Sequence, residues 1–125
     1  MSLHVNSVTI DCRDPRALAD WWAAVLDWTA FTMDDDDDGD VWLAPGTDPS
    51  EFPHAIPLLF LEDPNPKTVK NRLHLDLVPD DQDAEVARLE TLGATRVDIG
   101  QGDVSWVVMA DPEGNEFCVL RSYEG

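Results

Sequence analysis

The chain contains two copies of one short pattern of strand and helix signals. Residues 8–12 alternate between apolar and polar side chains, and Asp14-Pro15 then opens an amphipathic helical stretch. Residues 73–77 alternate in the same way, and Asp80-Asp81 opens a second helical stretch. Short strand-like runs follow each helix, so the order β-α-β-β-β is predicted twice. Because each half is too small to bury its own sheet and helix, we expect the halves to pair into one domain with a cleft between them.

Local signals set the boundaries of the expected elements. Asp14 is a candidate N-cap with Pro15 at the first helical position, and Gly93 is placed to end a second helix over 81–92. Strands are expected over 5–12, 28–33, 41–44, 56–61, 72–78, 95–99, 104–109 and 116–120. The two modules then span 4–63 and 68–122 of a single 125-residue domain, and a short, stiff Pro64–Lys67 segment joins them.

The composition excludes several classes of function. A net charge of −18 would repel a nucleic-acid backbone or an anionic membrane surface, so neither is an expected partner. No apolar run approaches the length of a membrane span, and we expect no secretion signal. Two cysteines without a Cys-x-x-Cys spacing suit a reducing cytoplasm, which is the predicted location.

The acidic run Asp34–Asp38 does not fit a calcium-binding EF-hand loop. If Asp34 is the first loop position, Gly39 falls correctly at the sixth position, but Pro45 falls at the twelfth. An EF-hand needs a bidentate Glu at the twelfth position. We therefore interpret the run as a solvated loop.

Strand alternation predicts which residues face the cleft. One set is expected beneath the helices: Val8, Ile10, Leu59, Leu61, Leu75, Leu77, Phe117 and Val119. The opposite set is expected on the open face: Ser7, Thr9, Asp11, Leu58, Phe60, Glu62, His74, Asp76, Glu116 and Cys118. A histidine and carboxylates beside aromatic walls, here Phe60 with Trp106 or Trp42, are typical of a small-ligand site. A solvated outer sheet face fits the same pattern equally well.

The chain resembles the vicinal-oxygen-chelate superfamily, which includes glyoxalase I, bleomycin-resistance proteins, fosfomycin-resistance enzymes and extradiol dioxygenases. The segments that carry the resemblance are 71–77, 89–94 and 110–118, together with 14–28 around the first helix. The chain is most similar to small glyoxalase-like domain proteins. The resemblance implies an α+β fold in which two βαβββ modules form a U-shaped mixed sheet around a cleft, with the helices on the outer face. It also implies a homodimer.

The resemblance further implies metal-ligand positions at Ser7 (or Thr9), Phe60, His74 and Cys118. Only His74 is a standard ligand there, because a thiolate is unusual in a nitrogen and oxygen site for Ni, Mn or Fe. A catalytic metal normally holds about three protein ligands. The classical site is therefore broken, and we expect no stoichiometric transition metal. The alternative is a shifted site that uses His74, Glu116 and either Glu62 or Asp76.

Two classes of function remain open. The first is a glyoxalase-like enzyme, a lyase or dioxygenase-like member of the superfamily, that acts on a small oxygenated molecule. In it, His74 is a base or ligand, and Glu116 or Asp76 is its carboxylate partner. The predicted ligand contacts are Ser7, Phe60, Glu62, Trp106 and Cys118. The second class is a non-catalytic protein that sequesters a small compound, as bleomycin-resistance proteins do. Neither class of function identifies a particular substrate.

Overall fold

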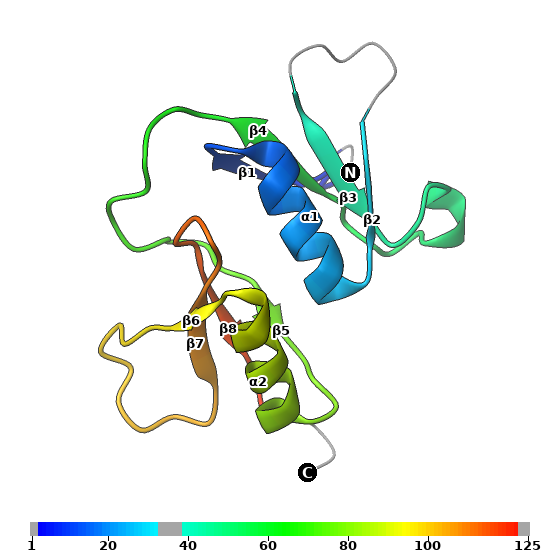
Figure 1. The fold of residues 1–125 in the computed structure, drawn as a ribbon. Coiled ribbons are helices and arrows are strands. Elements are labelled where there is room, and N and C mark those ends of the chain that lie inside the picture. The colour runs from blue at the N-terminus through cyan, green and yellow to red at the C-terminus, as the bar shows by residue number, and fades with distance from the viewer. Residues whose placement is uncertain (1–2, 33–38, 123–125) are drawn as a thin grey trace. The chain divides into compact units, whose positions relative to one another are not determined.

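The structure is a computed structural model that describes residues 3–32 and 39–122. The chain divides into two compact units, Met1–Pro66 and Lys67–Gly125. Among the described residues, each unit contains one α-helix and a four-stranded mixed sheet. Figure 1 labels these elements. The predicted order β-α-β-β-β is therefore confirmed in both halves of this α+β chain. The acidic run Asp34–Asp38 lies outside the described residues.

The first unit follows the predicted boundaries closely. Its elements are β1 (Val8–Cys12), α1 (Pro15–Leu26), β2 (Thr29–Phe31), β3 (Val41–Ala44), the 3-10 helix η1 (Pro49–Glu51) and β4 (Leu58–Glu62). The Asp14 side chain accepts a hydrogen bond from the backbone N–H of Ala17 at 3.1 Å, so it caps α1 as predicted. The strand order is β1-β4-β3-β2, with β1 parallel to β4 and the other pairs antiparallel.

The face assignment of β4 was wrong. In the parallel pair, Ile10 lies beside Phe60 and Cys12 lies beside Glu62. Partners on neighbouring strands share a face, so Leu58, Phe60 and Glu62 belong with the helix-side residues of β1 and not with Ser7. Phe60 is fully buried, and α1 packs against β3 and β4. The predicted ligand-facing wall at Phe60 is part of the hydrophobic core of the first unit.

The second unit repeats the topology of the first. Its elements are β5 (Asp76–Leu77), α2 (Gln82–Leu92), β6 (Thr95–Arg96), β7 (Val107–Ala110) and β8 (Glu116–Val119), in the sheet order β5-β8-β7-β6. Asp81 caps the start of α2, and Gly93 ends it with a φ of 111°, a conformation that glycine adopts without strain. The expected strand over 72–78 is shorter than predicted, because only Asp76–Leu77 has strand geometry.

The turn before β8 is built around one buried carboxylate. Asp111 is 5% exposed, and its side chain accepts hydrogen bonds from the backbone N–H groups of Glu113 and Asn115 at 2.9 and 3.0 Å. Gly114 completes the turn with a φ of 88°. This turn fixes where β8 begins, and β8 supplies the floor of the pocket described next. Within 3–32 and 39–122, neither α-helix is long and apolar enough to cross a membrane.

Candidate functional site

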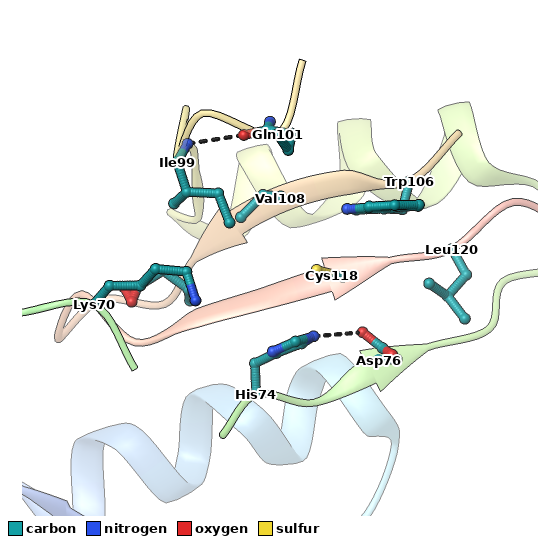
Figure 2. Close-up of a pocket in the computed structure, with 10 residues that line it drawn as sticks. Lys70, His74, Asp76, Ile99, Gln101, Trp106, Val108, Cys118 and Leu120 are labelled. Atoms are coloured by element: carbon teal, nitrogen blue, oxygen red, sulfur yellow. Dashed lines mark hydrogen bonds and ion pairs between the residues drawn. The ribbon is translucent and has the colours of Figure 1, made fainter. Parts of the chain in front are cut away.

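The second unit contains a pocket of about 420 Å³ on its sheet. Its lining residues are Lys70, His74, Asp76, Ile99, Gln101, Trp106, Val108, Glu116, Cys118 and Leu120. None of them belongs to α2, in which Val86 and Leu89 are buried. Figure 2 shows His74 and Asp76 on one side of Cys118, and Trp106 and Val108 on the other. This arrangement follows from the sheet order β5-β8-β7.

Strand register brings three polar side chains together at the floor of this pocket. Asp76 of β5 lies directly beside Cys118 of β8, so their side chains share a face. His74 precedes Asp76 by two residues and therefore points to the same side. The His74 Nε2 atom lies 3.1 Å from Asp76 Oδ1, and the two side chains are 39% and 51% exposed. The pair is thus accessible from solvent, while Cys118 is buried.

Glu116, the second predicted catalytic carboxylate, is occupied by protein partners. Its Oε2 atom lies 2.6 Å from Lys67 Nζ, and its Oε1 atom accepts the backbone N–H of Asn71 at 2.8 Å. Burial alone would raise the pKa of Glu116, but the Lys67 ammonium, the Asn71 N–H and the nearby Lys70 outweigh it and lower that pKa. Glu116 therefore holds the segment that leads into His74 against β8, and it is a poor general base.

The surroundings of Cys118 favour its protonated thiol form. Burial raises the pKa of Cys118, and the charge and hydrogen bond of neighbouring Asp76 raise it further, while Lys70 partly opposes them. A reactive cysteine needs the opposite environment, in which positive charge lowers the pKa of the thiol. Cys118 therefore lacks the surroundings of a reactive cysteine. Cys12 is also buried, and its thiol donates to the carbonyl of Leu61.

Lys70 was missed by the sequence reasoning. It lines one end of the pocket, as Figure 2 shows. Its ammonium group donates to the Asn71 carbonyl at 3.0 Å. The chain contains only two lysines, and both lie within 67–70, just before His74. In a chain of net charge −18, this local concentration of positive charge was the signal that could have identified it.

The structure brings some of the predicted site residues together and separates others. His74, Asp76, Glu116, Cys118 and Trp106 all line the pocket of the second unit. Ser7, Phe60 and Glu62 belong to the first unit and do not line this pocket. Ser7 is half-buried just before β1, and Glu62 is exposed at the end of β4.

The classical nitrogen and oxygen metal site does not fit these residues. Among the positions assigned by resemblance, Phe60 offers no donor atom and is enclosed in the core. The shifted alternative also loses Glu116, because both of its oxygens already have partners. Instead, the described residues place a different donor set within reach: donor atoms of His74, Asp76 and Cys118 all lie within 4.8 Å of one another.

Comparison with solved structures identifies the fold. A glyoxalase/bleomycin resistance protein/dioxygenase family enzyme from Burkholderia phytofirmans PsJN aligns with a TM-score of 0.69 and 17% identity, covering 94% of this chain and 97% of that one. The fosfomycin resistance protein FosX from Mesorhizobium loti aligns with a TM-score of 0.68 and 13% identity over 96% and 92% of the two chains. TnmS3, an antibiotic-binding protein from Streptomyces sp. CB03234, aligns with a TM-score of 0.65 and 20% identity over 98% of each chain.

A family model gives the more specific assignment. No curated protein sequence matches the chain. The model of the glyoxalase-like domain, however, matches residues 7–120, which include all the strands and α-helices that the structure describes. With both βαβββ units covered, the chain belongs to the glyoxalase-like domain family.

Proposed function

We propose that the pocket of the second unit binds a small oxygenated molecule and that His74 is its principal polar contact. The observation that carries the proposal is the His74–Asp76 pair, 3.1 Å apart and open to solvent, in a pocket of about 420 Å³. That volume falls within the range of small-molecule sites, which combine apolar walls with a few polar groups. Trp106, Val108 and Leu120 supply apolar surface beside the pair.

The pair supports a proton-transfer role for His74. The proton on Nε2 is directed to Asp76, so Nδ1 is the nitrogen that can accept a proton from a bound molecule. Asp76 fixes the orientation of the ring, as carboxylates do for many catalytic histidines. In this reading, the enzyme removes a proton from a carbon or hydroxyl group of the ligand, and Trp106 packs on its apolar part.

The second candidate is a non-catalytic binding protein. It is favoured by the environment of Glu116, since the ion pair with Lys67 leaves the pocket with one candidate base instead of two. The structurally similar TnmS3 is described as an antibiotic-binding protein. In this reading, His74 and Lys70 hydrogen-bond the ligand and no bond in the ligand is made or broken.

Binding and turnover can be tested in one set of experiments. A library of small hydroxy acids, keto acids, epoxides and phosphonates, with fosfomycin and bleomycin included, is screened against ¹⁵N-labelled protein by amide shift changes. We expect hits to perturb amides of β5, β7 and β8. His74→Ala should weaken the binding of each hit at least tenfold. His54→Ala replaces an exposed histidine of the first unit and should leave the affinity for each hit unchanged.

The outcomes separate the candidates. Conversion of a bound compound, lost in His74→Ala, supports the enzyme, whereas tight binding without conversion supports the binding protein. Hits that cluster elsewhere, hits indifferent to His74→Ala, or an empty screen at millimolar concentration would overturn the proposal. The predicted homodimer is tested separately by sedimentation velocity, and the predicted cytoplasmic location by fractionation of cells.

A further inference from the structure

Lys70 supplies a positive charge at one end of the pocket. Within the described residues, its ammonium group donates one hydrogen bond, to the carbonyl of the neighbouring Asn71 at 3.0 Å, and forms no ion pair with a carboxylate. An ammonium group has three N–H donors, so two remain for a ligand. The other lysine, Lys67, differs because its ammonium group is occupied by Glu116 at 2.6 Å. Lys70 is therefore a cation that a bound molecule can reach.

The backbone beside Lys70 is fixed to the floor of the pocket. The N–H of Asn71 donates to Glu116 Oε1 at 2.8 Å, and the Asn71 side chain donates to Asn115 Oδ1 at 3.4 Å. Glu116 belongs to β8, so these contacts hold the segment next to the sheet. Burial raises the pKa of both Glu116 and Cys118, and the Lys70 ammonium opposes that change at each of them. The charge of Lys70 therefore acts on two side chains that line the pocket.

From these contacts we propose that the ligand of this pocket is a small carboxylic acid with an apolar body, and that Lys70 pairs with its carboxylate. The inference rests on the proposed binding of a small oxygenated molecule, and it adds the charge of that molecule and its orientation. Figure 2 shows Lys70 toward one end of the pocket, Trp106 and Leu120 toward the other, and His74 between them. The apolar body then packs on Trp106 and Leu120, and a hydroxyl group next to the carboxylate donates to His74 Nδ1.

The negative charges that line the pocket favour this orientation over the reverse one. The Glu116 carboxylate already has an ammonium partner at 2.6 Å. The Asp76 carboxylate has only the imidazole of His74, at 3.1 Å, as its ion-pair partner. A ligand carboxylate beside Asp76 would therefore meet a like charge. Lys70 lies on the other side of His74 from Asp76 in Figure 2, so the carboxylate avoids this repulsion there.

The overall charge of −18 makes a local cation necessary for such a ligand. A field of that sign opposes the approach of any anion. At physiological salt the field is largely screened beyond about 8 Å, whereas an ammonium and a carboxylate in contact are separated by no salt solution. Hydrogen bonds between charged groups are also stronger than those between neutral groups. Replacement of Lys70 should therefore change which ligands the pocket prefers.

Matched ligands that differ in charge test the proposal. The probes are mandelate and 2-hydroxy-4-methylpentanoate, each compared with its neutral primary amide in amide-shift titrations of ¹⁵N-labelled protein. We expect each acid to bind at least about fivefold more tightly than its amide, because its hydrogen bond with Lys70 is charge-assisted. Lys70→Met should abolish this preference, and Lys70→Arg should retain it. Arg72→Met removes the same charge from an exposed neighbour that does not line the pocket, and it should leave the preference unchanged.

Circular dichroism of each variant checks that the fold is intact, and the exposure of Lys70 and Arg72 makes their replacement tolerable. Equal affinity for acid and amide, a preference that persists in Lys70→Met or is lost in Arg72→Met, or no binding of either acid at millimolar concentration would overturn the proposal.

The same titrations separate this proposal from the proposed function. Equal binding of acid and amide that is lost in His74→Ala would refute the pairing with Lys70 and leave the proposed function standing, as would neutral hits in the compound screen. A preference for the acids that depends on Lys70 and is indifferent to His74→Ala would support this proposal and refute the role of His74.

Discussion

The ion pair between Glu116 and Lys67 gives the sharpest test of how the pocket is held together. Replacing Glu116 by Gln keeps an acceptor for the Asn71 N–H but removes the charge that faces Lys67 at 2.6 Å. Exposed ion pairs contribute about 0–1 kcal/mol, and breaking a fully buried one costs about 3–5 kcal/mol. The Glu116 and Lys67 side chains are 8% and 21% exposed, so this pair lies between these limits. We expect Glu116→Gln to lower the free energy of unfolding by about 1.5 kcal/mol at pH 7.

The pH dependence follows from the lowered pKa of Glu116. Because the folded state binds the Glu116 proton more weakly than the unfolded chain, the carboxylate stabilises the fold above its unfolded pKa of about 4.3. This stabilisation is lost as the pH falls through the lowered folded-state pKa. The difference between wild type and Glu116→Gln should therefore be largest at pH 7 and should nearly vanish at the acid end of the titration.

Urea unfolding followed by circular dichroism, at several pH values, measures this difference. The matched control is Glu90→Gln, which removes an exposed partner of Arg96 at 3.6 Å and should cost less than about 1 kcal/mol at every pH. Hydrogen exchange adds a local readout, since loosening of 67–74 should raise exchange there before it rises in α2. A Glu116→Gln effect no larger than that of Glu90→Gln, or one independent of pH, would refute the reasoning.

Three other predictions concern the fold. Phe60→Ala should lower the free energy of unfolding by about 3–5 kcal/mol, because it opens a cavity in the core. Phe52→Ala, at a partly exposed side chain, should lower it far less. Equal decreases for the two variants in urea titrations would contradict the burial of Phe60 in the core. Asp111→Ala should lower the free energy of unfolding by about 1–3 kcal/mol, because the backbone N–H groups of the turn, including that of Asn115, lose their acceptor. An unchanged midpoint of thermal unfolding would contradict this prediction. The short Pro64–Lys67 link predicts that both units unfold in one calorimetric transition, and two resolved transitions would exclude it.

The order of elements was readable from the sequence because it depends on neighbours along the chain. Asp14 and Asp81 cap helices through hydrogen bonds to backbone N–H groups three residues away. Gly93 ends α2 because glycine adopts positive φ without strain. These local signals, repeated in both halves, determined the two βαβββ units.

In the second unit, alternation also predicted which side chains share a face of the sheet. Asp76 and Cys118 share a face, and His74 follows by the two-residue period of an extended chain. The sequence could therefore nominate the chemistry of this site. It could not supply the His74–Asp76 distance or the burial of Cys118, because both depend on how β5 lies against β8.

What only the tertiary structure decided is how strands pair and which charges meet. The register of β1 with β4 moved Phe60 from an expected open face into the core, since a shift of one residue reverses every side chain of a strand. Glu116 changed from a candidate catalytic group to a structural one because Asn71, 45 residues earlier, donates to it and Lys67 pairs with it. Such contacts join segments far apart in sequence, and no local pattern encodes them.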